Sequence, residues 1–323
     1  MAFRLLKIFT LLFVLIFFDS CQYSSDCDFT SVVYFDADSA YSYIEKQVNF
    51  GSRIPNSDAQ EQCAFYLQNK LESFGANVII QNANVTRFDG ENLKMINIIG
   101  QYYPEKERRI LLFAHWDSRY FADMAPEGED KFIPVTGAND GASGVGVLLE
   151  IARQIEIKEP NVGIDIIFFD AEDQGQPLYL DIYDEKAWCL GSQFWCENPH
   201  VENYDALFGI SLDMVGTKDA VFQRDDNSRY FNNSVVKKMW EIGQKLGHEE
   251  YFVENLSKPI LHDHVFVSQL AGIRSIMIID NENSKNIPYF DMWHTHNDDI
   301  SGIDKNTLKA VGETVLTFLY CEK

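Results

Sequence analysis

The sequence predicts an α/β protein, with a single domain built on a twisted, mostly parallel central sheet and helices on both faces. Residues 164–169 form a short apolar run broken only by Asp165. Such runs are typical of strands that are buried on both faces of a parallel sheet. Similar runs at 109–114, 206–212 and 275–279 alternate with segments of helical period. No linker, repeat or shift in composition divides the 323 residues, of which 46% are apolar, so one large domain is expected.

The segments between these runs supply the remaining elements. Apolar residues recur at helical spacing in 38–49, 57–74, 145–155, 235–247 and 304–320, which predicts helices there. Ser57, with Gln60 three residues later, resembles a capping box, and Gly75 follows as a C-terminal cap. Residues 77–82 and 95–102 are expected to form a hairpin pair at one edge of the sheet. The aromatic segment 184–198 has no clear period.

The first 20 residues are set apart from the fold. Arg4 and Lys7 precede an apolar run at 8–18, which is too short for a membrane-spanning helix of about 20 residues. A basic start, a short apolar core and a small residue are typical of a secretory signal. Cys21 directly follows Ser20, which favours a lipoprotein signal that leaves Cys21 lipidated, and an ordinary cleaved signal with export to the periplasm is the alternative. We therefore expect an exported protein in the periplasm or at the cell surface, with a tether at 21–35 and a catalytic domain at 36–323.

The charge balance limits the partners. The net charge is −22, from 27 basic and 49 acidic residues, which argues against binding to nucleic acid or to anionic lipid because little would neutralise phosphates. Membrane contact is expected through the lipid anchor only, and the protein is expected to be a monomer. Five cysteines remain after Cys21. Export permits disulfides, and Cys189 and Cys196 are the closest pair in sequence, but the spacing leaves the pairing open.

Acidic residues and histidines follow the predicted strands. Asp170, Glu172 and Asp173 come directly after 164–169, and ligand-type residues recur at the other strand ends and loops. Open α/β sheets bind their ligands beyond the carboxyl ends of the strands. Imidazole nitrogens and carboxylate oxygens are ligands of catalytic zinc, which takes about three protein ligands and leaves one position open. The candidate residues are His115, Asp117, Asp140, Glu172, Asp173, Asp213, Asp263 and His294.

Several longer motifs strengthen this interpretation. They are HWDSR at 115–119, GANDGASGVGVLLEIAR at 137–153, FFDAED at 168–173, WCLGSQFW at 188–195, LDMVG at 212–216 and WHTHND at 293–298. Together they resemble the glutaminyl-peptide cyclotransferases of the bacterial branch, which is related to the animal enzymes and built on the zinc-aminopeptidase (M28) scaffold. The resemblance runs from about Val48 to the C-terminus. It implies a zinc-exopeptidase-like fold and the cyclisation of N-terminal glutamine of peptides and proteins to pyroglutamate.

The resemblance also implies roles for the candidate residues. One zinc ion per chain would be held by Asp140, Asp173 and His294, with Glu172 as the general acid and base. Asp213 and Asp263 are the further candidates for proton transfer. The substrate pocket would be walled by Trp293 and Trp188. Its hydrogen-bonded floor would include His115, Trp116, Asp117 and Asp213.

Two other functions remain open at this point. A two-zinc aminopeptidase of the same scaffold would bind a second zinc ion through His115 and Asp213, with Asp140 bridging. An inert binding module would require lost ligands, and the three zinc positions are all occupied by ligand-type residues. One position departs from the family, which usually carries Asp-Asp-His where this chain has His262, Asp263 and His264. Histidine at 262, in place of the usual aspartate, changes the charge and the proton sharing next to Glu172.

Overall fold

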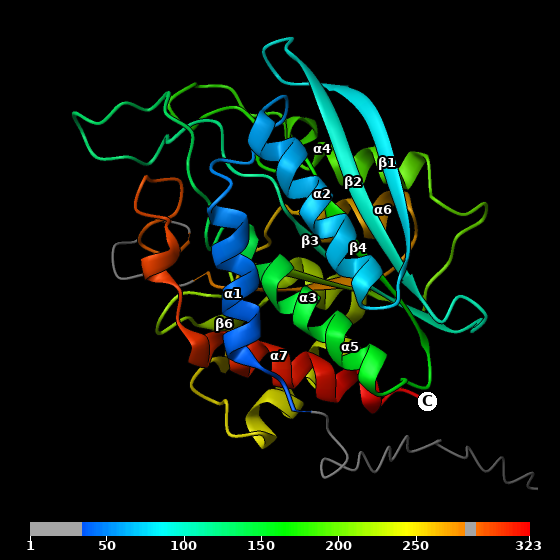
Figure 1. The fold of residues 1–323 in the computed structure, drawn as a ribbon. Coiled ribbons are helices and arrows are strands. Elements are labelled where there is room, and N and C mark those ends of the chain that lie inside the picture. The colour runs from blue at the N-terminus through cyan, green and yellow to red at the C-terminus, as the bar shows by residue number, and fades with distance from the viewer. Residues whose placement is uncertain (1–33, 282–288) are drawn as a thin grey trace, which may run out of the picture.

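The central sheet of the computed structural model, which describes residues 34–281 and 289–323, has six strands (Figure 1). The strand order is β1-β2-β4-β3-β5-β8. β4, β3, β5 and β8 run parallel to one another, and the β1–β2 hairpin joins β4 through an antiparallel pairing of β2 with β4. The bounds are β1 Asn77–Thr86, β2 Asn92–Tyr102, β3 Arg109–His115, β4 Gly163–Phe169, β5 Gly209–Asp213 and β8 Ser275–Ile279. The predicted α/β class, the mostly parallel sheet and the edge hairpin are confirmed.

Alternate residues of the buried strands face two different apolar cores. In β3, Ile110, Leu112 and Ala114 belong to the larger core, whereas Leu111 and Phe113 belong to the smaller one. This is the two-residue period of a strand that is covered on both faces. Asp165, the polar break in β4, is buried in an ion pair with Arg109, with an N–O distance of 2.6 Å. The pair explains how a carboxylate is tolerated inside the sheet, since buried charges need a partner.

Helices cover both faces of the sheet, as predicted. α3 (Ala142–Ile157) packs on β3 and β5, and α1 (Ala37–Val48) and α7 (Lys305–Tyr320) pack against α3. α2 (Asp58–Ser73) lies along the hairpin, and α5 (Asp226–Lys245) packs on β8. On the opposite face lie α4 (Leu190–Glu197) and α6 (Asp263–Leu270), whose Trp195 and Val267 belong to the smaller core. The Ser57 side chain accepts a hydrogen bond from the Gln60 N–H at 3.1 Å, so it caps α2 as the sequence suggested.

Several local features differ from the expectations. The aperiodic aromatic segment contains α4, and short 3-10 helices occur at Glu185–Ala187 and Ile300–Gly302. α5 begins nine residues before the expected 235 and is kinked at Asn232, whose φ and ψ are −151° and 69°. A second sheet of two parallel strands, β6 (Phe222–Asp225) and β7 (Phe252–Ser257), was not expected. Their sequences, FQRD and FVENLS, are mostly polar and contain no apolar run that would indicate a strand.

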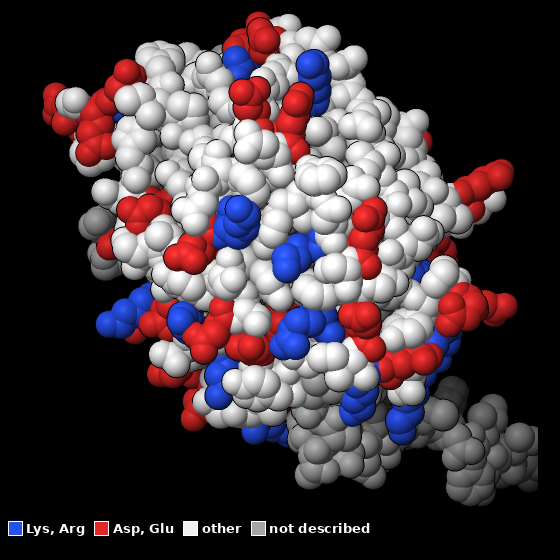
Figure 2. All heavy atoms as spheres, viewed as in Figure 1, with Lys and Arg blue, Asp and Glu red and all other residues white. Residues whose placement is uncertain are grey.

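Figure 2 shows acidic side chains spread over the viewed face with Lys and Arg among them. Within the described residues, no helix combines the length and the apolar character needed to cross a membrane. Cys63, Cys189 and Cys196 are free thiols, so the closest pair in sequence is not bonded, and Cys321 is disulfide-bonded. The predicted signal and Cys21 lie outside the described residues.

Candidate metal and catalytic site

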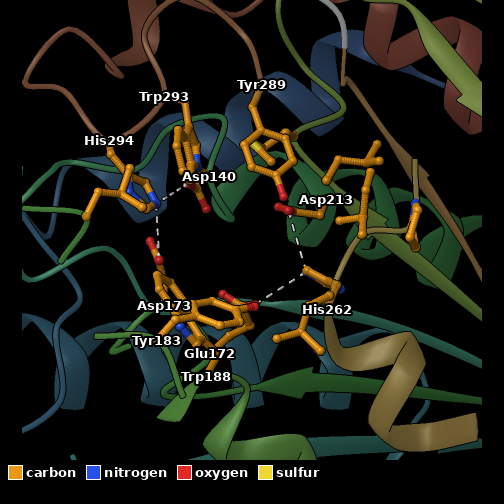
Figure 3. A pocket seen from close by; sticks show the side chains of 16 residues that line it. Asp140, Glu172, Asp173, Tyr183, Trp188, Asp213, His262, Tyr289, Trp293 and His294 are labelled. Atoms are coloured by element: carbon orange, nitrogen blue, oxygen red, sulfur yellow. Dashed lines mark ion pairs between the residues drawn. The ribbon is translucent and has the colours of Figure 1, made fainter. Parts of the chain in front are cut away.

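A cavity of about 310 Å³ opens beyond the carboxyl ends of β3, β4, β5 and β8 (Figure 3). Parallel strands direct these ends to one edge of the sheet, where α/β proteins bind ligands. The loops after β4 and β5 and the segments before α6 and around 289–294 provide its walls. The lining residues are Asp140, Glu172, Asp173, Leu178, Tyr183, Trp188, Asp213, Met214, Pro259, Ile260, Leu261, His262, Ile279, Tyr289, Trp293 and His294.

Asp140, Asp173 and His294 meet on one side of this cavity. The Nε2 atom of His294 lies 3.2 Å from Asp173 Oδ1 and 3.7 Å from Asp140 Oδ2. The three residues are buried, and their ligand atoms lie within 4.8 Å of one another. Asp173 Oδ2 is buried without a hydrogen-bond partner among the described residues. This donor set, two carboxylates and one imidazole, fits a zinc ion with an open position.

A second layer of contacts orients the imidazole. Asp123 Oδ1 lies 2.9 Å from Nδ1 of His294, so the carboxylate holds the ring with Nε2 toward the cluster. Arg119 pairs with Asp123 at 3.0 Å and donates to the Asp173 carbonyl at 2.8 Å. Burial opposes protonation of His294, but Asp173 and Asp123 outweigh it and raise its pKa to about 9. For Asp173, burial disfavours the charged carboxylate and raises the pKa to about 6. The carboxylates of the cluster therefore stabilise a positive charge placed between them, and a bound metal cation would supply that charge.

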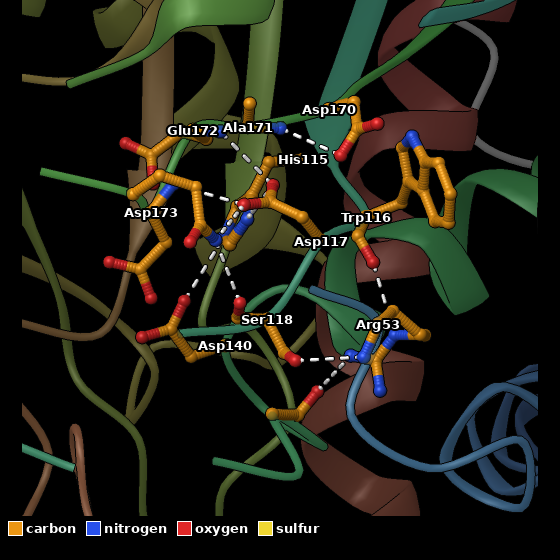
Figure 4. Close-up of polar contacts among 12 residues, drawn as sticks. Arg53, His115, Trp116, Asp117, Ser118, Asp140, Asp170, Ala171, Glu172 and Asp173 are labelled. Atoms are coloured by element: carbon orange, nitrogen blue, oxygen red, sulfur yellow. Dashed lines mark hydrogen bonds and ion pairs between the residues drawn. The ribbon is translucent and has the colours of Figure 1, made fainter. Parts of the chain in front are cut away.

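His115 connects the cluster to β5 through its contacts with Asp140 and Asp213. Figure 4 shows its ring between Asp117 and Asp140. Its Nε2 atom is 3.0 Å from Asp140 Oδ1 and 3.1 Å from Asp213 Oδ1, and its Nδ1 atom is 3.3 Å from Asp117 Oδ1. Gly141 makes room for the ring, since a Cβ there would lie 2.3 Å from Nε2. Asp117 also accepts hydrogen bonds from the Glu172 and Asp173 N–H groups, at 3.1 and 3.2 Å. One buried carboxylate thus positions the loop that carries both acids.

Glu172 stands on the cavity wall beside the Asp140–Asp173–His294 cluster and outside it. The Cys189 thiol donates to Glu172 Oε1 at 3.1 Å. Burial raises the pKa of Glu172 well above its usual range, with Asp263, Asp173 and Asp213 adding to the effect against the opposing charge of His115. A carboxyl group with a raised pKa can both accept and return a proton near neutral pH. Asp263 lies behind this wall, fully buried, and its Oδ1 accepts from the Ser192 hydroxyl at 2.5 Å.

Two tryptophans form part of the wall, and a third does not. Trp188 packs over Gly175, where a Cβ would lie 2.1 Å from the indole, and Arg119 sits 4.6 Å above its ring. Trp293 stacks on His294 with ring centroids 3.7 Å apart. Trp116 was expected in the pocket, and this expectation is wrong. It is fully buried in the larger core, and its indole N–H donates to the Ile96 carbonyl at 3.0 Å.

Sequence reasoning missed several functional neighbours. Arg119 ends the HWDSR motif and Asp123 follows it four residues later, but neither was predicted to contact the site. Tyr183 and Tyr289 line the cavity from loops without a periodic pattern. The acidic, Pro- and Gly-rich loop after residue 119 offered no signal for Asp123. His262, which was noted only as a departure from the family, also lines the cavity. Burial and the neighbouring His115 and His264 lower its pKa well below its usual value, so the ring is neutral.

The fold and this site define a zinc-exopeptidase-like α/β protein, and comparison with known proteins supports the same class. Residues 97–319 match peptidase family M28, and the chain belongs to that family. A glutaminyl cyclase from Bacteroides thetaiotaomicron, solved with N-acetylhistamine bound, is 49% identical, covers 90% of this chain and 100% of its own, and superposes with a TM-score of 0.88.

Of two further relatives, one is described as an aminopeptidase and the other as a cyclotransferase. A structure described as a leucine aminopeptidase precursor from the same organism is 49% identical, with 90% of this chain and 99% of that one covered and a TM-score of 0.87. The glutaminyl-peptide cyclotransferase of Dictyostelium discoideum is 25% identical over 259 residues, which is 75% of this chain and 68% of its own. The family and its exopeptidase-like members imply zinc at this site, and the cyclase relatives support an acyl-transfer reaction.

Proposed function

We propose that this protein is a zinc-dependent glutaminyl-peptide cyclotransferase, which converts N-terminal glutamine of peptides and proteins to pyroglutamate and releases ammonia. The observation that carries the proposal is the division of roles in the acid pair. Asp173 belongs to the cluster with Asp140 and His294, whereas Glu172 faces the cavity beside them. A general acid and base next to one metal position is the arrangement that this reaction needs.

The reaction is an intramolecular acyl transfer. The α-amine of the substrate attacks its own γ-amide carbon, a carbon–nitrogen bond forms, and the amide carbon–nitrogen bond breaks to release ammonia. Glu172 takes the proton that the amine loses and returns it to the leaving nitrogen. Asp213 also borders the cavity and can hold the amine by accepting a hydrogen bond from one of its N–H groups. Because the nucleophile is part of the substrate, catalysis is mainly a matter of orientation and proton transfer.

The walls support this chemistry. A zinc ion held by Asp140, Asp173 and His294 would polarise the γ-carbonyl as a Lewis acid. Trp188, Trp293 and Tyr289 enclose a space suited to one folded side chain. The buried Trp188 indole N–H has no partner among the described residues. Apolar walls exclude water and keep the pKa of Glu172 raised by desolvation.

The alternative is a two-zinc aminopeptidase. His115, Asp140 and Asp213 form a second buried group whose ligand atoms lie within 4.8 Å of one another, and one relative of high identity carries an aminopeptidase name. The Glu172–Asp173 pair favours the cyclase, because peptidases of this scaffold typically have Glu-Glu there. An aminopeptidase would also need a bound water as nucleophile.

Metal content and products together separate the two functions. Protein purified without added zinc should hold close to one zinc ion per chain and release ammonia, but no free amino acid, from Gln-peptides. His294→Ala should lose most of the zinc, whereas His296→Ala, which removes a partly exposed imidazole two residues away, should keep it. Two zinc ions per chain with release of free amino acids would establish the aminopeptidase instead.

A further inference from the structure

His262 is a buried, titratable residue of the cavity wall to which the proposed reaction gives no role. Its side chain is nearly fully buried, and its Nε2 atom has no hydrogen-bond partner among the described residues. That atom lies 3.5 Å from Asp213 Oδ2 and 3.9 Å from Glu172 Oε1 (Figure 3). These distances are too long for good hydrogen bonds. A buried nitrogen on a cavity wall without a protein partner indicates a ligand that binds there.

A second imidazole faces the same point. His115, Glu172 and His262 form a buried group whose ligand atoms lie within 4.8 Å of one another. In both histidines the outer nitrogen already has a protein neighbour. Nδ1 of His115 is 3.3 Å from Asp117 Oδ1, and Nδ1 of His262 is 3.4 Å from Ser211 Oγ. Metal-bound histidines usually donate their other N–H to such an oxygen, which orients the ring toward the metal.

The spacing of the donor atoms suits a transition metal ion. Zinc binds imidazole nitrogen and carboxylate oxygen at about 2.0–2.2 Å, so tetrahedral ligands lie roughly 3.4 Å apart. The separations of 3.5 and 3.9 Å around His262 Nε2 are close to that value. Asp213, whose Oδ1 is 3.1 Å from His115 Nε2, is near enough to both imidazoles to supply a fourth ligand. The set of two nitrogens and two oxygens favours zinc over magnesium or calcium.

We propose that His115, Glu172 and His262 form a second, weaker site for a divalent transition metal ion such as Zn²⁺, and that filling this site inhibits the enzyme. The site differs from the His115–Asp140–Asp213 group in its dependence on His262 and Glu172. The weaker affinity follows from the contacts that Nε2 of His115 already makes. It lies 3.0 Å from Asp140 Oδ1 and 3.1 Å from Asp213 Oδ1, and the ring must give up at least one of these contacts to bind an ion at this site. The inhibition, unlike the binding, rests on the proposed function, since a metal-bound Glu172 can no longer move protons.

A titration of the one-zinc protein with Zn²⁺ tests the binding. By calorimetry, the wild type should take up a second equivalent, and His262→Asn should bind that equivalent at least about 10-fold more weakly, as expected when a ligand is removed. His296→Asn, which removes an imidazole outside the cavity, is the matched control and should bind as the wild type does. Retention of the first zinc ion in each variant shows that its fold is intact.

Two results would overturn the binding claim. The claim is refuted if the wild-type protein never binds more than one equivalent of zinc at any zinc concentration. If His262→Asn takes up the second equivalent as well as the wild type does, the ion lies on His115, Asp140 and Asp213 instead.

The inhibition is measured in the same proteins as the ratio of Gln-peptide turnover with and without excess zinc. Turnover by the wild type should fall as the second equivalent binds, and His262→Asn should need at least about 10-fold more zinc for the same fractional loss. Full activity of the wild type with two equivalents bound would refute the inhibitory role. If no protein turns over Gln-peptides at all, the proposed function fails, while the calorimetry still decides the metal site.

Discussion

Two neighbouring residues, Glu172 and Asp173, carry different parts of the chemistry because their side chains face different partners. Asp173 meets His294 at 3.2 Å, while Glu172 accepts from the Cys189 thiol and borders the open cavity. Asp117 holds both backbone N–H groups, so the two carboxylates are fixed relative to each other. Such preorganisation removes the cost of arranging the groups during the reaction.

Substituting Glu172 tests its role at this scale. Glu172→Gln keeps the size and the hydrogen-bonding shape of the side chain but cannot transfer a proton. Turnover of Gln-peptides should fall by about 10²–10⁴-fold or more, the usual contribution of general acid–base catalysis. Zinc content and substrate affinity should barely change, because Glu172 is outside the cluster of Asp140, Asp173 and His294. Loss of the single zinc ion held by Asp140, Asp173 and His294 would make Glu172 a ligand of that ion, and full activity would move the proton transfer to Asp213 or Asp263.

The sequence predicted most of the candidate site, because its residues follow strand ends and occur in long motifs. The structure brings Asp140, Asp173 and His294 together from three separate segments and places Glu172, Trp188, Asp213 and Trp293 around the same cavity. Trp116 was wrongly expected in the pocket because the two-residue period of β3 was not continued to the residue that follows the strand. Ile110, Leu112 and Ala114 face the larger core, and Trp116 continues that series. Contacts between distant loops, such as Asp123 with His294, leave no pattern in one sequence.

At the scale of elements, α3 positions Asp140 by packing unusually close to the sheet. A Cβ at Gly144 would lie 2.3 Å from the Leu212 carbonyl oxygen and 3.0 Å from Ala114 Cβ. Glycine is therefore required where the helix approaches the backbone of β5. The sequence showed this helix by its period, whereas β6 (FQRD) and β7 (FVENLS) were missed because they are mostly polar and form no apolar run like those of β5 and β8.

Gly144→Ala should have two opposite effects on the free energy of unfolding. Helix propensity alone would make alanine more stable by about 1 kcal/mol. The clash is with backbone, which cannot rotate away, and overpacking of this kind costs about 1–3 kcal/mol. We expect the clash to prevail and the free energy of unfolding in guanidinium chloride to fall. Glu156→Ala, at an exposed position of the same helix, should change it by less than about 0.5 kcal/mol. A Gly144→Ala variant more stable than the wild type would contradict the close packing.

α2 carries a buried thiol with a consequence at high pH. Burial raises the pKa of Cys63 from near 9 to about 12. Above pH 9 the unfolded chain therefore releases this proton while the folded protein keeps it, so stability falls as the pH rises toward 12. The contribution is about 1.4 kcal/mol per pH unit for one group. Cys63→Ala should be less stable at pH 7 because of the cavity, yet its stability should fall less steeply above pH 9. Equal slopes in urea unfolding series would contradict the shift.

At the scale of the whole molecule, the site and the N-terminal segment lie in different parts of the chain. The domain carries the cavity at one edge of its sheet, and acidic groups spread over the surface in view. We propose that residues 1–20 direct export and that Cys21, which lies outside the described residues, carries a lipid anchor. This proposal rests on the apolar run at 8–18 followed by Ser20 and Cys21.

Metabolic labelling with a fatty-acid analogue tests the anchor. The wild-type protein should be labelled and recovered with membranes. Cys21→Ser should lose the label and appear in the soluble fraction, while Cys63→Ser, at a buried thiol, should remain labelled. Labelling that persists in Cys21→Ser would rule out lipidation at this position, and an ordinary cleaved signal would then be the better explanation.

The fate of solvent oxygen tests the central claim most directly. Gln-peptides are incubated with the protein in water enriched in the heavy oxygen isotope, and the masses of the products are measured by mass spectrometry. Cyclisation uses the amine of the substrate as nucleophile, so we predict a pyroglutamyl peptide without heavy oxygen and one ammonia released for each amine lost. A heavy oxygen atom in the carboxylate of a freed amino acid, or in the γ-carboxylate of a deamidated peptide, would show that water attacks and would contradict the account.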